Sequence, residues 1–284
     1  MFVDVFKPVI KREKRIVNAI ATRPLTLVTG ASGGIGADLA ELAARDGHDL
    51  IVVARRVEAL EARARALAAL HGVAVHAYAC DLSDPGAVDA LCARLATDGR
   101  RITNLVNNAG YGVFGEFAVS DLADEQRMMR LNMEAPVILA KRLLPGIIAG
   151  RGCVLNVAST AGFQPGPYMA VYYASKAFVL NWSDALAEEL RNTGVRVTAL
   201  CPGPTRTGFQ DRAAMHASGL LRWVPGTSSA EVARAGWDGA RRGRRVVIPG
   251  LFNRVMAQSV RGMPRRMVTT IVRAMSAPRA GAGL

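Results

Sequence analysis

The sequence predicts an α/β fold with a doubly wound parallel sheet of about seven strands and helices on both of its faces. Short apolar runs alternate along the chain with longer segments of helical periodicity, and this alternation is typical of βαβ units. The runs LIVVA and CVLNVA lack the period-two alternation of half-exposed strands, so they suit strands buried on both faces. With 284 residues, the chain is long enough for one such domain with a full core.

The predicted elements follow one another in a regular order. Strands are expected at residues 24–29, 49–54, 73–79, 102–107, 153–158, 195–200 and 245–249. Helices are expected between them, at residues 35–46, 57–70, 84–97, 122–131, 134–149, 171–192 and 229–241. Parallel neighbours need crossovers of about a dozen residues, and these helical segments are long enough to provide them.

A glycine-rich turn, TGASGGIG at residues 29–36, joins the first strand to the first helix. Gly30, Gly34 and Gly36 follow the spacing T-G-x-x-x-G-x-G, and the segment after them has apolar side chains at helical spacing. A strand, a tight loop and a helix N-terminus in this order present backbone N–H groups to a pyrophosphate. The turn therefore predicts a dinucleotide site.

A serine, a tyrosine and a lysine form a second pattern. Tyr172 and Lys176 are four residues apart in VYYASKAF and share one face of a helix, and Ser159 ends a predicted strand. An ammonium beside a phenol favours the phenolate, so Lys176 is expected to lower the pKa of Tyr172. Such a tyrosine can exchange a proton with a carbonyl or an alcohol, and the Ser159 hydroxyl can reach the same oxygen. Tyr173 lacks this spacing to Lys176.

Further motifs occur in order around these two. ITNLVNNAG at residues 102–110 ends in Asn107, Asn108, Ala109 and Gly110, where small residues allow a ligand to approach and amides can bond to it. Together, TGASGGIG, NNAG, Asn132, Ser159, YYASK and CPGPTRT resemble the motifs of the short-chain dehydrogenase/reductase family. The resemblance covers about residues 24–248.

This resemblance implies a single-domain Rossmann-type fold and hydride transfer between NAD(H) or NADP(H) and a carbonyl or secondary alcohol. It implies that Asn132, Ser159, Tyr172 and Lys176 are the catalytic residues. Tyr172 is expected to act as general acid beside Ser159, Lys176 to hold the ribose, and Asn132 to position a proton-relaying water. A non-catalytic scaffold that binds a dinucleotide is the alternative from a different class, although such proteins typically lose the tyrosine or the lysine.

The end of the second strand indicates which cofactor is used. An acidic residue there accepts hydrogen bonds from the ribose 2′-hydroxyl of NAD, whereas an arginine accommodates a 2′-phosphate. This strand ends in Arg55 and Arg56, so NADP(H) is expected in preference to NAD(H). The resemblance implies that Pro202, Gly203, Thr205 and Thr207 border the nicotinamide.

The full set of cofactor residues expected is Gly30, Ser32, Gly34, Ile35, Gly36, Arg55, Arg56, Asp81, Leu82, Asn108, Ala109, Gly110, Tyr172, Lys176, Pro202, Gly203, Thr205 and Thr207.

Segments 111–117, 162–170 and 209–225 are expected to line the substrate pocket. The main candidates there are Phe114, Phe163, Met169, Phe209, Met215 and Trp223, with Phe117, Leu220 and Leu221 beside them. An apolar lining suits a lipophilic ketone better than a sugar. The extension after the last strand also resembles the family branch that includes 3-oxoacyl and 17-keto steroid reductases. A sugar- or polyol-directed dehydrogenase is the alternative.

The distribution of charge divides the chain into three regions. The net charge is +13, of which +4 lies in residues 1–23 and +10 in residues 222–284, which leaves −1 between them. We therefore distinguish a basic amphipathic N-terminal extension (1–23), a catalytic domain (24–250, with a lid region at 204–225) and a basic amphipathic C-terminal extension (251–284).

The apolar stripes of both extensions leave two alternatives open. Basic amphipathic helices often lie on anionic membrane surfaces. The same stripes could instead dock on the domain or on a partner subunit while the arginines face water. Neither extension has a run of about eighteen apolar residues that could span a membrane. A signal peptide is not expected, because Asp4 and Lys7 interrupt the apolar residues at the N-terminus.

The remaining expectations concern location and partners. The four cysteines are dispersed without a CxxC pair, which predicts a reducing, cytoplasmic environment. Neither the cysteines nor the four histidines have the spacing of metal ligands, so no metal site is expected. Nucleic-acid binding is not expected either, because no recognition motif accompanies the charge. A homodimer or homotetramer is expected.

Overall fold

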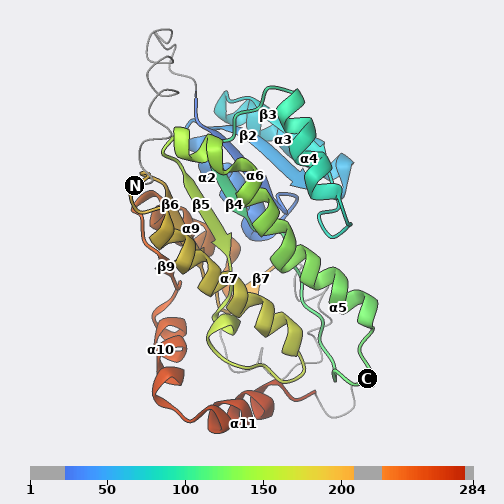
Figure 1. The fold of residues 1–284 in the computed structure, drawn as a ribbon, viewed down its shortest axis with the longest axis vertical. Coiled ribbons are helices and arrows are strands. Elements are labelled where there is room, and N and C mark those ends of the chain that lie inside the picture. The colour runs from blue at the N-terminus through green and yellow to red at the C-terminus, as the bar shows by residue number, and fades with distance from the viewer. Residues whose placement is uncertain (1–22, 208–225, 279–284) are drawn as a thin grey trace, which may run out of the picture.

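The computed structural model describes residues 23–207 and 226–278, which form one parallel seven-stranded sheet flanked by helices (Figure 1). The strand order is β3-β2-β1-β4-β5-β6-β9. The strands are β1 (Leu25–Thr29), β2 (Asp49–Ala54), β3 (Val75–Ala79), β4 (Asn104–Asn107), β5 (Cys153–Val157), β6 (Arg196–Leu200) and β9 (Val246–Val247). The predicted doubly wound parallel sheet is confirmed, although the last strand is shorter than expected.

The middle strands are buried on both faces, because most of their side chains are apolar in both directions and buried polar ones are hydrogen-bonded, as Asn107 is to Asn156 (2.9 Å). Helices α2 (Gly34–Arg45), α3 (Val57–His71) and α9 (Ser229–Arg241) pack on one face, around Leu39, Leu60 and Trp237. Helices α4 (Ala87–Thr97), α6 (Ala135–Ala149) and α7 (Ala170–Glu189) cover the other face, around Leu91 and Leu139. Two separate apolar cores therefore hold the sheet between two layers of helices.

The strand order reverses beside β1, which pairs with β2 on one side and β4 on the other. Loops from such neighbouring strands diverge and leave a crevice at the carboxyl ends. Here the crevice is braced by hydrogen bonds to Thr29, whose Oγ1 accepts from the backbone N–H of Asn108 (2.9 Å) and of Ala109 (3.0 Å). The end of β4 is thereby fastened to the glycine-rich turn.

The connection between β4 and β5 differs from the prediction of two separate helices. Helix α5 (Leu122–Met129) runs directly into a π-helical turn, Arg130–Glu134, and then into α6. Asn132 lies in this turn and is buried. Turns of this kind place an extra residue in a helix and are frequent at functional sites.

Two further features close the carboxyl end of the sheet. A short parallel pair, β7 (Thr205–Arg206) and β8 (Thr227–Ser228), was not predicted. After β9, helix α10 (Leu251–Ser259), a 3₁₀ turn (Val260–Gly262) and helix α11 (Arg265–Ser276) cross this end, and Figure 1 shows α11 beneath the end of α7. No helix of residues 23–207 and 226–278 is long and apolar enough to cross a membrane. The expectations for residues 1–22 fall outside the described residues.

Candidate active site

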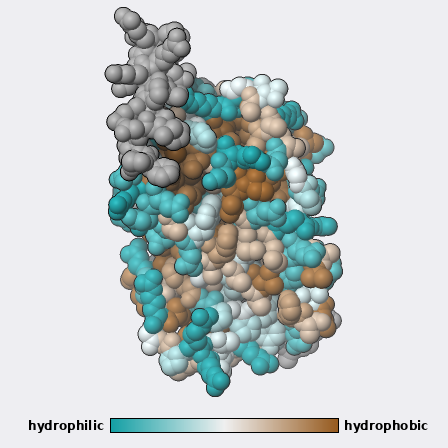
Figure 2. Space-filling model, viewed as in Figure 1, coloured by the Kyte–Doolittle hydropathy of each residue, from teal (hydrophilic) through white to brown (hydrophobic). Residues whose placement is uncertain are grey.

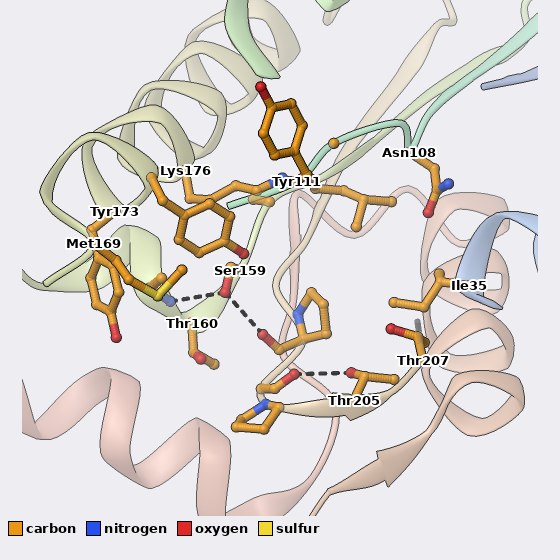
Figure 3. Close-up of a pocket in the computed structure, with 18 of the residues that line it drawn as sticks. Ile35, Asn108, Tyr111, Ser159, Thr160, Met169, Tyr173, Lys176, Thr205 and Thr207 are labelled. Carbon is orange, nitrogen blue, oxygen red and sulfur yellow. Dashed lines mark hydrogen bonds between the residues drawn. The ribbon is translucent and has the colours of Figure 1, made fainter. Parts of the chain in front are cut away.

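A cavity of about 750 Å³ opens at the carboxyl end of the sheet, where the loops after the strands meet α10 and α11. Figure 3 shows Ser159 and Lys176 on one side of it, and Ile35, Asn108 and Thr207 on the other. Most of the residues predicted for the cofactor line this cavity: Gly30, Ser32, Gly34, Ile35, Arg55, Arg56, Asp81, Leu82, Asn108, Ala109, Gly110, Tyr172, Lys176, Pro202, Gly203, Thr205 and Thr207.

The glycine-rich loop has a conformation that side chains would disturb. Gly30 and Gly34 have φ angles of +66° and +55°, which strain any other residue. Gly36 does not line the cavity, and a Cβ there would lie 2.3 Å from Nδ2 of Asn108. Asn108 occupies that space and donates hydrogen bonds to the carbonyls of Thr29 (2.9 Å) and Gly30 (3.3 Å). Asn108 therefore supports the loop from behind.

Ser159 stands just beyond the end of β5, where it caps a short 3₁₀ turn, Thr160–Phe163. Its Oγ accepts a hydrogen bond from the backbone N–H of Ala161 (3.1 Å) and lies 3.4 Å from the carbonyl oxygen of Pro202, to which it donates (Figure 3). The hydroxyl is also hydrogen-bonded to the phenol of Tyr172. These contacts fix the serine hydroxyl beside the tyrosine.

Tyr172 and Lys176 are both buried in α7, with 9% and 5% of their surface exposed. The Lys176 ammonium donates to the carbonyl of Val157 (2.9 Å), and its Nζ lies 5.8 Å from the ring centroid of Tyr172. Burial lowers the pKa of Lys176 to about 8. Burial also raises the pKa of Tyr172, while the hydrogen bond with Ser159 opposes the rise. The expected lowering of the Tyr172 pKa is therefore wrong for the protein alone, because burial outweighs the hydrogen bond with Ser159.

Asn132 does not line the cavity but joins the elements that do. Its Oδ1 accepts from the backbone N–H of Tyr111 (3.2 Å), and its Nδ2 donates to the Tyr111 carbonyl (2.9 Å) and to Oγ of Ser175 (3.0 Å). Ser175 in turn donates to the carbonyl of Tyr172 (2.7 Å). Asn132 thus connects the loop after β4 to the first turn of α7.

The basic end of β2 lies at the opposite side of the cavity. Arg55 and Arg56 are exposed there, and the Arg55 guanidinium is 3.9 Å from a carboxylate oxygen of Asp81. Asp81 accepts hydrogen bonds from the backbone N–H (3.0 Å) and the hydroxyl (2.6 Å) of Ser83. Burial would raise the pKa of Asp81, but these bonds and Arg55 hold it below its usual value.

The predicted substrate residues are only partly found in the cavity. Met169 lines it. Phe114 does not, because its ring packs beside that of Tyr168, with 6.1 Å between centroids. Phe163 packs instead into the cluster around Ala158 and Ala257. Phe117 is 67% exposed. Phe209, Met215, Leu220, Leu221 and Trp223 lie outside the described residues.

Sequence reasoning missed the contribution of the C-terminal helices to this cavity. The side chains that they add are mostly apolar: Phe252, Asn253, Met256, Ala257, Ser259, Val260, Met263, Val268, Ile271, Val272 and Met275. Asn253 also packs against Gly203, where a Cβ would lie 2.4 Å from its Oδ1. The apolar stripes at helical spacing were the signal, but they did not reveal which side faces the domain.

Two polar contacts fasten α11 over the site. Ser276, which is buried, hydrogen-bonds to the phenol of Tyr173. Burial raises the pKa of that phenol to about 12, although the hydrogen bond acts to lower it. Arg273 hydrogen-bonds to Tyr168. Tyr168 itself has a φ of +69°, which is unusual for a residue with a side chain. We call the side of the cavity formed by α10 and α11 its roof. Tyr173 therefore contacts the roof, whereas Tyr172 lies on the opposite side with Ser159.

Comparison with known protein families gives a match over most of the chain. Residues 24–217 match the sequence profile of a family described as short chain dehydrogenase. A short-chain dehydrogenase from Sphingobium yanoikuyae in complex with NADPH has a similar structure, with a TM-score of 0.75 and 35% sequence identity. That similarity covers 92% of this chain and 98% of the other.

Two characterised relatives are similar over a shorter stretch. A sulfoacetaldehyde reductase from Chromohalobacter salexigens is 40% identical over 185 residues, which are 64% of this chain and 72% of that protein. A ketoacyl reductase, HetN, from Nostoc sp. is 34% identical over 183 residues. These are 64% of this chain and 63% of the reductase, so the match spans just under two thirds of that relative.

Proposed function

This chain belongs to the short-chain dehydrogenase family, and we propose that it is an NADP(H)-dependent enzyme that reduces a lipophilic ketone of 3-oxoacyl or steroid-like form. As a member of this family, it is an oxidoreductase that acts on CH–OH and C=O groups. One observation carries the finer proposal. Ser159, Tyr172 and Lys176 share a single cavity with the glycine-rich loop, the arginines after β2 and the apolar side chains of α10 and α11.

The glycine-rich loop fits the pyrophosphate of a dinucleotide. The N-terminus of α2 has no side-chain cap, which leaves backbone N–H groups for an anion. Gly33 and Gly34 border the cavity, and a Cβ at Gly33 would meet nothing within 4 Å, so this backbone is open to a ligand. When bound there, the nicotinamide supplies or accepts the hydride.

The catalytic side chains act on the substrate oxygen. The raised pKa of Tyr172 keeps its phenol protonated, so it can donate to the oxygen of a ketone as negative charge develops there. Ser159 is held beside that phenol, and its hydroxyl can turn from the Pro202 carbonyl, 3.4 Å away, to donate a second hydrogen bond to the same oxygen. Lys176 contributes a positive charge beneath the ring of Tyr172 while it remains protonated.

The preference for NADP(H) rests on the surface at the end of β2. Arg55 and Arg56 are exposed beside the cavity, and no acidic residue follows the strand directly. A 2′-phosphate can pair with these arginines, whereas a neutral 2′-hydroxyl brings no negative charge to them. NADP(H) therefore fits this end of the site better than NAD(H).

The preference for a lipophilic substrate rests on the roof of the cavity. Met256 lines it from α10 and Ile271 from α11, while Met169 lies just before α7 and Met263 between α10 and α11. An apolar wall leaves most hydroxyls of a sugar without partners, and unsatisfied polar groups bind poorly. Flexible methionines also adapt to apolar surfaces of different shapes.

A substrate panel would test the proposal. NADPH oxidation should be measured with a 3-oxoacyl thioester, a 17-keto steroid and a ketose, and each assay should be repeated with NADH. We expect turnover of at least one lipophilic ketone, with a higher kcat/KM for NADPH than for NADH. Faster turnover of the ketose would favour the sugar-directed alternative. Tight NADPH binding without turnover of any carbonyl or alcohol would favour a non-catalytic scaffold.

The proposal also covers location and assembly. Cys80, Cys92, Cys153 and Cys201 are free thiols, which suits the reducing cytoplasm. The ring of Phe178 is 41% exposed on α7 and stacks on Trp182, with 6.3 Å between centroids. Exposed aromatic pairs of this kind are typical of subunit interfaces, which supports a homodimer or homotetramer.

A further inference from the structure

The outward sides of α10 and α11 carry exposed apolar side chains. Asn253, Ala257, Val268 and Val272 face inward and are buried. On the outward side, Leu251, Val255 and Met267 are 75%, 57% and 47% exposed. In Figure 2, hydrophobic and hydrophilic side chains mingle over the lower part of the molecule, where Figure 1 shows these helices. The outer face, defined here by Leu251, Val255 and Met267, is therefore not covered by the part of the domain that the structure describes.

The same segment is strongly basic. Residues 251–278 contain five arginines and no acidic residue: Arg254, Arg261, Arg265, Arg266 and Arg273. All five are exposed. Among the ion pairs of the described residues, none includes a side chain from this segment. Arg273 hydrogen-bonds to Tyr168, and the charge of the other four is thus available to an external partner.

The combination of apolar and cationic groups on this face indicates which kind of partner fits it. A second copy of the chain packed about a twofold axis would bring arginines against arginines without acids between them. A nucleic acid would meet the charge but leave Leu251 and Val255 without apolar contact. An anionic lipid surface satisfies both, because headgroups pair with arginines while aliphatic side chains enter the acyl boundary. We propose that the outer face of α10 and α11 docks on an anionic membrane surface.

This orientation has a consequence for the cavity. Phe252, Met256 and Ile271 are 51%, 40% and 41% exposed and also line the cavity. The cavity is therefore bordered by the element that would lie on the membrane. If the substrate is a lipophilic ketone, as the proposed function holds, it could pass from the lipid into the site. The docking itself does not rest on the identity of the substrate.

Vesicle co-sedimentation of the full chain would test the docking. The probes are vesicles of phosphatidylcholine mixed with phosphatidylglycerol, and vesicles of phosphatidylcholine alone, at low and high KCl. One variant combines Arg254→Gln, Arg265→Gln and Arg266→Gln. Its matched control combines Arg101→Gln, Arg242→Gln and Arg244→Gln, which are exposed arginines away from α10 and α11. A second variant combines Leu251→Ser and Val255→Ser. Its matched control combines Leu70→Ser and Val119→Ser, which are also at exposed positions.

We expect binding to the anionic vesicles only. Binding should weaken at high salt, because the electrostatic screening length shortens to about 3 Å at about 1 M KCl. Each arginine contributes about fivefold, so the first triple variant should bind roughly a hundredfold more weakly while its control keeps most of its affinity. Leu251→Ser with Val255→Ser should also weaken binding, while NADPH oxidation with a water-soluble ketone stays unchanged in every variant.

Several results would overturn the proposal. One is no binding of the native chain at low salt, and another is equal loss in both triple variants, which would indicate net charge alone. Unchanged binding in the α10 and α11 variants would place the contact elsewhere, for example in residues 1–22. A change of oligomeric state in Leu251→Ser with Val255→Ser, measured by light scattering, would assign the face to a second copy. Loss of ketone reduction with vesicle binding intact would count against the proposed function only.

Discussion

Burial favours the neutral form of both Tyr172 and Lys176, which supports the proposed reduction at Tyr172 and opposes it at Lys176. For Tyr172, the neutral phenol is the form that would donate a proton to a ketone in the proposed reaction. For Lys176, the neutral amine has lost the positive charge that the ammonium places beside the ring of Tyr172. The pair is therefore suited to reduction over a pH range that ends where Lys176 deprotonates.

Tyr172→Phe should remove most turnover and leave NADPH affinity within a few-fold, because the phenol acts on the substrate oxygen. A positioned general acid contributes about 10²- to 10⁴-fold, and the loss in kcat should fall in this range. Tyr173→Phe is the matched control, since that phenol bonds to Ser276 and faces the roof. Steady-state kinetics and cofactor fluorescence would measure both. An equal loss of kcat in the two variants would show that the roles of the two tyrosines are misassigned.

The pKa of Lys176 predicts an alkaline limit to activity. Because burial lowers this pKa to about 8, the ammonium is charged below pH 8 and neutral well above it. The kcat/KM for ketone reduction should therefore fall as pH rises through about 8. Tyr172 does not set this limit, since its pKa is raised. A profile that stays flat to pH 10, in an enzyme shown to be folded there by circular dichroism, would contradict the assignment.

Arg55→Asp should shift cofactor preference toward NADH. The substitution removes a cation from the expected 2′-phosphate position and places a carboxylate there beside Asp81, which lies 3.9 Å from the present guanidinium. Charged contacts of this kind contribute about 1.5–3 kcal/mol, so the ratio of kcat/KM for NADPH over NADH should fall roughly ten- to a hundredfold. Arg65→Gln, on the exposed side of α3, should leave the ratio unchanged.

At the scale of elements, α11 is attached to the active site through α7. Its buried side chains, Val268 and Val272, pack in one cluster with Met169, Tyr172 and Tyr173. The bond between Ser276 and Tyr173 fixes the far end of the helix next to Tyr172, the proposed general acid. The position of the roof is therefore coupled to the residue that follows Tyr172 in the chain.

Ser276→Ala should loosen the attachment of α11 to α7 without changing the groups proposed to react with the substrate. It leaves the buried Tyr173 hydroxyl without its partner, at a cost of about 1–3 kcal/mol in unfolding free energy. We expect a higher KM for a lipophilic ketone, with kcat and NADPH affinity nearly unchanged. Ser276→Thr, which keeps the hydroxyl, should restore KM. Thr270→Ala removes a hydroxyl from the exposed side of the same helix and should have no effect.

The elements near the sheet could be predicted from sequence because local patterns determine them. Strands β1, β2 and β5 are buried on both faces and consist mostly of apolar residues without strict period-two alternation, which identifies them as central strands. The motifs carrying Ser159, Tyr172 and Lys176 follow β5 or start α7, and their proximity follows from that topology. The π-helical turn at Arg130–Glu134 has no periodicity of its own and was missed.

The roof of the cavity could not be predicted for a different reason. Its position depends on contacts between α11 and α7, which lie about a hundred residues apart in the chain and leave no local signal. Phe114 and Phe163 were expected in the pocket because they follow the right strands, yet neither lines it: Phe114 packs beside Tyr168 and Phe163 into the cluster around Ala158. Apolar character alone does not distinguish a residue that lines a cavity from one that fills a core.

At the scale of the whole molecule, the C-terminal helices form part of the wall of the cavity and are not a separate tail. They supply much of the apolar lining of the cavity, and Asn253 packs against Gly203 in the loop after β6. The charge of the chain is nevertheless concentrated in and beside this segment, while residues 24–221 have a net charge of −1. One element thus completes the site on its inner side and carries the positive charge on its outer side.

Deleting residues 251–284 should therefore damage the enzyme as well as any membrane contact. The deletion uncovers the cluster of Met169, Tyr172 and Tyr173 and removes the buried side chains of Val268 and Val272. Burial of each such side chain contributes about 1.5–3 kcal/mol, so the free energy of unfolding should fall by roughly 3–6 kcal/mol. Urea unfolding of the full and truncated chains would measure the difference.

The kinetic effect of this deletion should follow from the lost wall of the cavity. We expect the KM for a lipophilic ketone to rise more than the dissociation constant of NADPH, because the glycine-rich loop and Arg55 remain in the shortened chain. Leu251→Ser with Val255→Ser is the control, since it alters only the outer face and leaves the inner side chains in place. A truncated chain with unchanged unfolding free energy and unchanged KM would show that α10 and α11 do not form the roof, and the cavity would then have to be closed by other residues.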